Sequence, residues 1–365
     1  MKESKSSGST LEDRLRSLSV KGKLFESLPE GRVLCYACAH RCTIFPGHKG
    51  ICKVRYNEGG ILYVPGGYVT SLQCDPIEKK PFFHALPGSL ALSFGMLGCD
   101  YHCSFCQNWV TSQALRDAAA GAPVREITAG ELVRIAIESG ARSVSSTYNE
   151  PIITAEWSVD IFEKAHEAGM YTSYVSNGNA TPEVLDYLDP HIDFFKVDLK
   201  AFSKKTYRGV GGRLEPVLET IERLVELDKW VEVVTLILPG INDSDGELKE
   251  IAAFLAGVSP GIPWHVTAYH PEYKMSEPGP TPVSTLLRAV EIGRKAGLYF
   301  IYAGNLPGLV GEEEHTRCPD CGELLIKRYG FRILAYRLDG PRCPACGREI
   351  PGRWPEKAIP PEDLF

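Results

Sequence analysis

The sequence predicts an α/β protein whose centre is a full or partial parallel (β/α) barrel. From about residue 90, short apolar runs rich in β-branched and aromatic residues alternate with segments of helical period. Near-continuous apolar strands separated by helices are typical of parallel strands covered on both faces, and about seven such units favour a barrel over an open sheet. Clustered cysteines stand before and after this region, and they predict an N-terminal Cys-rich segment and a C-terminal zinc-ribbon-like module.

The predicted strands come in a regular series. They are residues 91–97, 143–148, 171–176, 193–199, 231–238, 265–269 and 298–303. Helix signals lie between them: Thr128 with Glu131 forms a capping box, and Thr181 is a cap followed by proline. Glycines at 140, 169 and 297 are expected to end helices. In such a barrel the chemistry lies at the C-terminal ends of the strands.

The same patterns divide the chain into four parts. Residues 1–30 are expected to be a partly disordered N-terminal extension, with a short helix capped by Thr10. Residues 31–89 form the Cys-rich metal-binding segment and lead-in, residues 90–312 the barrel, and residues 313–365 the zinc-ribbon-like module and tail.

Composition excludes several classes of protein. The 365 residues hold 40 Lys and Arg against 46 Asp and Glu, a net charge of -6, so no basic surplus supports extended nucleic-acid binding. No apolar run has the length of a membrane span, and the opening MKESKSSGST lacks the apolar core of a secretory signal. We therefore expect a cytoplasmic protein without a membrane partner, whose thiols are reduced.

Eleven of the 12 cysteines fall into three groups, as is typical of metal sites in a reducing compartment. Cys74 stands alone and is expected to be a small buried apolar residue. The C-terminal cysteine group has two C-x2-C knuckles 21 residues apart, which predicts a closed structural zinc site, with a rubredoxin-like iron site as the alternative. Its members are Cys318, Cys321, Cys343 and Cys346.

The N-terminal cysteine group has the spacing C-x2-C-x3-C-x9-C and consists of Cys35, Cys38, Cys42 and Cys52. Four thiolates at this spacing suit either zinc or an auxiliary [4Fe-4S] cluster. His40 or His48 in place of one cysteine is a further alternative.

The third group lies in the cysteine loop, residues 98–108, where Cys99, Cys103 and Cys106 have the spacing C-x3-C-x2-C. A structural zinc site wants four ligands, so this loop predicts a [4Fe-4S] cluster with one iron left open to another molecule. The alternatives are a zinc site completed by His102 or a plain cysteine-rich turn. The loop resembles that of the radical S-adenosylmethionine (SAM) superfamily, in which an aromatic residue, here Phe105, precedes the third cysteine.

This resemblance implies that the amino and carboxylate groups of SAM chelate the open iron. It further implies that an electron from the cluster cleaves the sulfonium, and that the resulting 5′-deoxyadenosyl radical abstracts hydrogen from a substrate. Asn149 and Glu150 follow the second strand, where the superfamily carries a Gly-Gly-Glu-like motif. The glycines are absent here. Both residues are expected to hold the methionine moiety, while the alternative is that this segment only begins a helix.

Later strand ends supply further cofactor candidates. Asn177 lies in a turn that resembles the Thr-Asn-Gly turn of glycyl-radical activases, which implies a contact with the ribose. Asp198 and Lys200 match the Asp-Leu-Lys triplet of the same activases, with an internal ion pair as the alternative. The turn 238–243 is expected near the adenine, and His270 is expected either to face substrate or to be structural.

Taken over residues 30–355, the chain resembles the AmmeMemoRadiSam-system radical SAM enzymes, relatives of the pyruvate formate-lyase activating enzyme. The resemblance rests on the cysteine groups, the Asp-Leu-Lys triplet and the block DPIEKKP at 75–81. Its Glu78, Lys79 and Lys80 are expected either to line an entrance to the site or to form a solvated charge run. The resemblance implies partners of the AMMECR and Memo types and an electron donor such as flavodoxin or ferredoxin.

The predicted function is reductive cleavage of SAM at a [4Fe-4S] cluster, followed by hydrogen abstraction from a protein glycine or a small molecule. The alternative is a non-catalytic, zinc-stabilised scaffold or interaction protein. A ribbon-mediated nucleic-acid modifier is a weaker third reading, because basic residues around the C-terminal knuckles are few.

Overall fold

The computed structural model describes residues 10–355. The polar stretch at residues 1–9, which the sequence predicts to be mobile, lies outside the described residues, as do residues 356–365. Thr10 does cap α1 (Leu11–Ser17): its hydroxyl accepts the Asp13 backbone N–H, and the Asp13 carboxylate in turn accepts the Thr10 backbone N–H.

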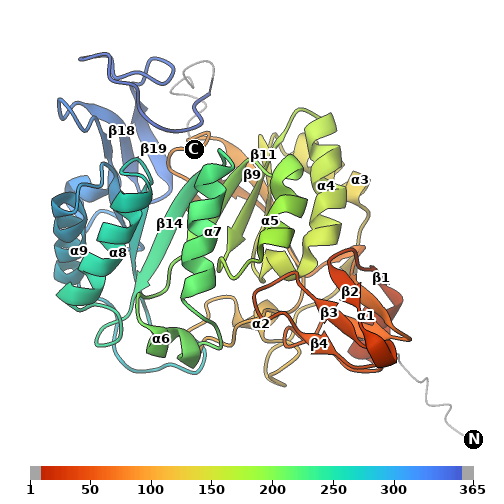
Figure 1. Cartoon of the computed structure of the whole chain (residues 1–365). Coiled ribbons are helices and arrows are strands. Elements are labelled where there is room, and N and C mark those ends of the chain that lie inside the picture. Colours follow the sequence, from red (N-terminus) through yellow and green to blue (C-terminus); the bar gives the residue numbers. More distant parts are fainter. Residues whose placement is uncertain (1–9, 356–365) are drawn as a thin grey trace, which may run out of the picture.

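An eight-stranded sheet forms the centre of the molecule (Figure 1). Seven parallel strands lie where the apolar runs predict them, and one antiparallel strand, β8, pairs with β9 at the edge. In chain order the strands are β8 (Ser71–Pro76), β9 (Leu90–Gly95), β11 (Ser143–Ser146), β12 (Tyr171–Ser176), β13 (Phe194–Asp198), β14 (Trp230–Ile237), β15 (Trp264–Ala268) and β16 (Ile301–Gly304).

The sheet is an open, partial barrel over the described residues, because no ladder joins β16 to β8 at its two ends. It also begins earlier than residue 90. The sequence did not predict β8, whose residues are mostly half-buried and lack the alternation of apolar and polar positions by which a strand is recognised. Cys74 lies in this strand and is half-buried.

Helices connect the parallel strands, and Figure 1 shows them standing along the strands. The long ones are α3 (Ala129–Glu138), α4 (Ala155–Glu167), α7 (Glu215–Glu226), α8 (Asp245–Val258) and α9 (Val283–Lys295), with the shorter α5 (Pro182–Leu188) between α4 and α7. The capping box of Thr128 and Glu131 and the Thr181 cap are both present. Gly140, Gly169 and Gly297 follow their helices with positive φ, as predicted.

The N-terminal region folds as small antiparallel sheets beside α4 and α5 (Figure 1, red). One sheet is β1 (Ser19–Lys21), β6 (Ile61–Pro65) and β5 (Tyr56–Glu58), and the other is β2 (Phe25–Ser27), β3 (Val33–Cys35) and β4 (Thr43–Ile44). β7 (Tyr68–Val69) pairs with β10 (Arg125–Glu126). Arg55 anchors the region: its guanidinium is 1% exposed and donates at 2.6 Å to Glu156 of α4.

The C-terminal region is a three-stranded antiparallel sheet of β17 (Thr316–Arg317), β18 (Leu324–Tyr329) and β19 (Arg332–Tyr336). It shares a buried apolar cluster with Phe83, Phe300 and Tyr302 of the main body, so it is packed onto the barrel rather than tethered to it.

No helix among the described residues is long and apolar enough to cross a membrane.

Candidate active site

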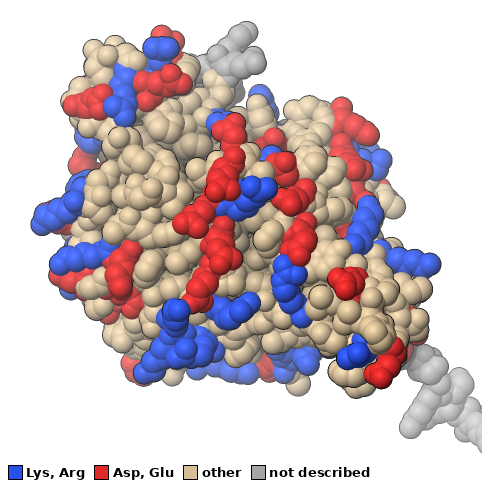
Figure 2. Space-filling view, viewed as in Figure 1, with Lys and Arg blue, Asp and Glu red and all other residues tan. Residues whose placement is uncertain are grey.

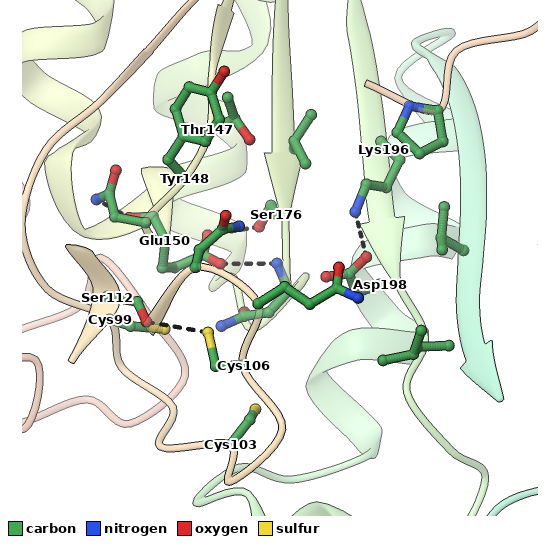
Figure 3. Close-up of a pocket in the computed structure, with 18 of the residues that line it drawn as sticks. Cys99, Cys103, Cys106, Ser112, Thr147, Tyr148, Glu150, Ser176, Lys196 and Asp198 are labelled. Atoms are coloured by element: carbon green, nitrogen blue, oxygen red, sulfur yellow. Dashed lines mark hydrogen bonds and ion pairs between the residues drawn. The ribbon is translucent and has the colours of Figure 1, made fainter. Parts of the chain in front are cut away.

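A cavity of about 430 Å³ lies at the C-terminal ends of the parallel strands, the position expected of the chemistry in a (β/α) barrel. All three cysteines of the cysteine loop line it, together with side chains that follow β11, β12 and β13. Figure 3 shows the sulfurs of Cys99, Cys103 and Cys106 near one another below Glu150 and Asp198. The structure therefore brings the cysteine loop and the ends of β11, β12 and β13 to one place.

The cysteine loop turns sharply out of β9. Gly98 has φ +95°, and a Cβ there would meet the Cys52 carbonyl oxygen at 3.0 Å, so this turn requires glycine. Cys99 Sγ accepts the Tyr101 backbone N–H at 3.3 Å, and Cys106 Sγ lies 3.2 Å from Ser112 Oγ. Burial raises the pKa of the Cys103 thiol to about 12, while the Lys200 ammonium opposes that rise.

The residues present fit a cluster held by three cysteines. Among the described residues that line the cavity there is neither a fourth cysteine nor a histidine. His102, the alternative zinc ligand, points elsewhere: a Cβ on Gly211 would meet its Cε1 atom at 2.3 Å, and His102 does not line the cavity. The three sulfurs therefore face the cavity without a fourth cysteine or histidine among the described residues that line it.

Asp100 holds the cysteine loop to the end of β12, and sequence reasoning missed it. Its side chain is fully buried, accepting Asn177 Nδ2 at 2.7 Å on one oxygen and Asn179 Nδ2 at 2.8 Å on the other. An acidic residue directly after the first cysteine was the available signal. Asn177 lines the cavity, as expected of a ribose contact, but both ends of its amide are already hydrogen-bonded, because its Oδ1 accepts the Asn179 backbone N–H.

Glu150 lies in the cavity wall and is 3% exposed. One carboxylate oxygen accepts Ser176 Oγ–H at 2.6 Å and the Ile152 N–H at 3.2 Å, and the other accepts the Asn177 N–H at 2.8 Å. Burial, and then the neighbouring Asp100, raises the pKa of Glu150 to about 8. The carboxylate has room for a fourth donor, which an ammonium group would supply.

The helix-start alternative for this segment also holds, since Glu150 caps the 3-10 helix Pro151–Thr154. Asn149 lines the cavity, but its amide is bonded to the backbone: Oδ1 accepts the Met96 N–H and Nδ2 donates to the Glu150 carbonyl. Phe105 lies in the cavity wall, 7% exposed.

Strand β13 and the residues directly after it contribute three charged side chains to the cavity: Lys196, Asp198 and Lys200. Alternation along the strand places all three on one face, as the sequence predicted for the last two. Asp198 pairs with both lysines, and Lys200 Nζ lies 3.1 Å from its Oδ2. Burial opposes ionisation, but Lys196 and then Lys200 lower the pKa of Asp198 to about 2, so it carries a fixed negative charge. The ion-pair alternative is thus present inside the cavity. Lys196 was missed although it is two residues from Asp198.

Lys79 and Lys80 line the cavity as expected, and Glu78 does not. Glu78 is fully buried and accepts the Gly88 backbone N–H, because the short 3-10 helix Ile77–Lys79 turns it away from the lysines. Lys80 Nζ contacts Tyr148 Oη and Asp75 Oδ2, each at 3.1 Å. Phe331, between β18 and β19, also lines the cavity, so the C-terminal region takes part in the site, which the sequence did not predict.

Two other expectations fall outside the cavity. His270 does not line it and lies 3.3 Å from Gln107 on the surface. The turn 238–243 is held by its own side chains, with Asn242 bonded to the Leu238 N–H and Asp243 to the Gly240 N–H, and none of its residues lines the cavity.

The C-terminal cysteine group has the geometry of a single-metal site. Its four sulfurs lie within 4.8 Å of one another, with 3.6 Å between Cys318 and Cys346 and between Cys321 and Cys343. Four thiolates at about 2.3 Å from one zinc ion require sulfur separations of about 3.8 Å. The other two cysteine groups are not gathered in this way.

A model of the radical SAM superfamily matches residues 95–255. The protein MJ0808 of Methanocaldococcus jannaschii is 39% identical over 333 residues, covering 89% of this chain and 97% of that protein. The 4-hydroxyphenylacetate decarboxylase activating enzyme of Clostridioides difficile is 24% identical over 229 residues, covering 59% of this chain and 72% of that enzyme. The pyruvate formate-lyase-activating enzyme of Staphylococcus epidermidis is 21% identical over 189 residues, covering 47% of this chain and 72% of that enzyme.

The chain belongs to the radical SAM superfamily. Within it, the chain is homologous to activating enzymes, including that of pyruvate formate-lyase. Membership implies an enzyme that binds SAM and a [4Fe-4S] cluster.

Proposed function

We propose that this protein reductively cleaves SAM at a [4Fe-4S] cluster held by Cys99, Cys103 and Cys106, and then abstracts a hydrogen atom from its substrate. One observation carries the proposal: three cysteines, Cys103 buried and the other two half-buried, line a single cavity, and among the described residues no fourth cysteine or histidine lines it. When bound, the cluster and SAM supply a 5′-deoxyadenosyl radical. The cysteine loop leaves one coordination position for a small chelating molecule.

Side chains of this chain have distinct tasks in the proposal. Glu150 accepts a hydrogen bond from the methionine ammonium, and Asn149 helps to orient it. Asn177 lies toward the ribose while fixing Asp100. Asp198 and Lys200, together with Lys196, present charges of both signs to a zwitterionic, cationic cofactor. Phe105 excludes water from the cluster side of the cavity.

The hydrogen comes either from a glycine of a partner protein or from a small molecule. Homology to activating enzymes supports a protein glycine as the hydrogen donor. Phe331 in the cavity wall supports a small molecule as the donor. The test is anaerobic turnover with SAM and a reductant, with deuterium-labelled candidates, and mass analysis of 5′-deoxyadenosine. Deuterium in that product identifies the donor. A colourless protein that holds only zinc and forms no 5′-deoxyadenosine would establish the scaffold alternative instead.

We further propose that the C-terminal cysteine group holds zinc. The short sulfur separations support a single tetrahedral ion, and none of the four cysteines lines the cavity. Metal analysis of the purified protein should find about one zinc ion bound there. If one iron with a rubredoxin-like spectrum were found instead, the rubredoxin-like iron site would be the correct assignment.

The electron donor we propose is an acidic carrier of the flavodoxin or ferredoxin class. Exposed basic residues gather around α6 (Lys204–Gly209), although the chain as a whole is acidic (Figure 2). They are Lys204, Lys205, Arg208 and Arg213. The residue after α6, Val210, accepts the His102 backbone N–H at 3.0 Å, so this basic surface lies directly beside the cysteine loop.

Charge reversal tests this surface. Lys205→Glu with Arg208→Glu should slow cluster reduction by an acidic protein donor and weaken its salt dependence, because electrostatic steering is lost. Reduction by dithionite should be unchanged. Equal slowing with both reductants would refute the docking surface.

Motif resemblance supports placing the chain in the AmmeMemoRadiSam system, with AMMECR-type and Memo-type proteins as partners. All 12 cysteines are free, which suits a reducing cytoplasm. Co-purification of a partner of either type with the tagged chain would test the assignment.

A further inference from the structure

The N-terminal cysteine group is buried on the side of the cysteine loop away from the cavity. Cys35, Cys38 and Cys52 are each at most 6% exposed, and Cys42 is half-buried. None of the four lines the cavity. The Cys35 backbone N–H donates to the Cys42 carbonyl at 2.9 Å, which brings the two ends of the segment 35–42 together.

The sulfurs lie in surroundings suited to metal ligands. The backbone N–H groups of Val54 and Arg55 lie near the Cys52 sulfur. The N–H groups of His40 and Ile51 lie near the sulfurs of Cys38 and Cys42. Such N–H groups directed at sulfur stabilise thiolate ligands.

A buried cation is also present beside this group. Arg55 is 1% exposed and its Nη atoms are bonded to Glu156 and the Ile153 carbonyl, but its Nε has no hydrogen-bond partner among residues 10–355. Its guanidinium lies within electrostatic range of Cys35 and Cys52. A buried N–H without an acceptor indicates a missing partner, and a sulfide or thiolate beside it would be one.

The two four-cysteine groups differ in spacing. The C-terminal sulfurs stand 3.6 Å apart in pairs and fit one ion, whereas no three sulfurs of the N-terminal group lie within 4.8 Å of one another. The three sulfurs of the cysteine loop are not gathered within that limit either. A cubane interposes iron and sulfide between its thiolates, so its ligand sulfurs stand farther apart than those on a single zinc ion.

We propose that Cys35, Cys38, Cys42 and Cys52 hold a second [4Fe-4S] cluster, and not zinc. Four thiolates occupy all four irons, so this cluster binds no substrate. Its surroundings are continuous with the active site. The Ala39 N–H donates to the Asn179 carbonyl at 2.9 Å, and Asn179 Nδ2 donates to Asp100, the neighbour of Cys99. On the other side, the Cys52 carbonyl packs against Gly98.

The test is iron, sulfide and zinc analysis of the full chain after anaerobic reconstitution, with Mössbauer spectra to identify the cluster type. Wild-type protein should hold about eight irons, and the variant Cys99→Ala, Cys103→Ala, Cys106→Ala should keep about four irons as a [4Fe-4S] cluster. The matched variant Cys38→Ala, Cys52→Ala should lose the N-terminal cluster and retain the one whose electron paramagnetic resonance (EPR) spectrum responds to SAM.

About four irons and a second zinc ion in the wild-type protein would overturn the proposal. A triple variant without iron, when the wild-type protein holds about four irons, would overturn it as well. The iron content of the wild-type protein is decisive even if a variant fails to fold. The outcome is separate from the proposed function: an N-terminal cluster in the triple variant stands whether or not the cavity cleaves SAM.

Discussion

The cysteine loop and the C-terminal cysteine group both bring thiolates together, and they differ in what remains open. The C-terminal group gathers four sulfurs around one point, on knuckles that do not line the cavity. The cysteine loop brings three sulfurs to the wall of a 430 Å³ cavity and leaves the fourth direction to other molecules. The number of protein ligands therefore distinguishes a structural metal site from a reactive one. At the reactive site, side chains at the surrounding strand ends are available to hold the molecule that takes the open position.

Removing one ligand from the cysteine loop should have the largest effect. Cys103→Ala should abolish reductive formation of 5′-deoxyadenosine, because two remaining thiolates hold the cluster poorly, while the melting temperature stays near that of the wild type. Product analysis by chromatography measures this. The control is Cys74→Ala on β8, which lies outside the cavity and should turn over normally. Unchanged turnover in Cys103→Ala would contradict the assignment.

The equivalent change in the C-terminal group should reverse the pattern. Cys321→Ala should release the metal and lower the melting temperature by roughly 10 °C, since about 3 kcal/mol or more of metal-coupled folding energy is lost. SAM cleavage should largely persist, because this cysteine lies away from the cavity. Zinc analysis, differential scanning fluorimetry and the cleavage assay together check it. Loss of cleavage without loss of stability would show that the two regions are not separable.

Glu150 allows a finer test through pH. Its pKa of about 8 in the folded protein lies above the ordinary 4.5, so the folded protein without SAM holds an extra proton between these values and loses stability as pH rises through that window. A bound ammonium favours the ionised carboxylate. SAM affinity should therefore rise by up to roughly tenfold per pH unit below pH 8 and then level off.

Glu150→Gln is the matched variant for this test, because it keeps the shape and removes the titration. Its SAM affinity should be weaker and nearly independent of pH between 6 and 8. Anaerobic calorimetry in two buffers of different ionisation enthalpy would detect the released proton. An equally steep pH profile in the variant would assign the dependence to another group.

The smallest effect is expected at Phe331, where the C-terminal region meets the cavity. Phe331→Ala should leave SAM cleavage within about threefold and change substrate-coupled turnover more than uncoupled cleavage, because it opens one wall without touching the cysteines. Tyr329→Ala is the control, since Tyr329 is 55% exposed and does not line the cavity. Identical behaviour of the two variants would remove the C-terminal region from the active site.

Much of the fold could be predicted because its signals are local. The seven parallel strands are apolar runs, and the caps at Thr128 and Thr181 depend on residues three apart. Strand β8 was missed because an edge strand with half-buried residues has neither an apolar run nor clean alternation. The predicted segment boundary at residue 90 fell between β8 and β9, which pair with each other.

The sequence predicted those residues of the candidate site that lie in the cysteine loop or directly after a strand. Glu150, Asp198 and the three loop cysteines do line the cavity. The partners of these residues depend on register between strands: Asp100 reaches Asn177 and Asn179 across 77 and 79 residues of sequence. No local pattern reports such pairs, so Asn177 was predicted to contact only the cofactor.

The most direct test of the open iron is the EPR spectrum of the reduced protein with and without SAM, recorded on the Cys38→Ala, Cys52→Ala variant so that one cluster contributes. A cluster held by Cys99, Cys103 and Cys106 should shift its spectrum when SAM is added, because SAM becomes a ligand of the fourth iron. A spectrum that SAM leaves unchanged, at concentrations where binding is measured independently, would contradict the account.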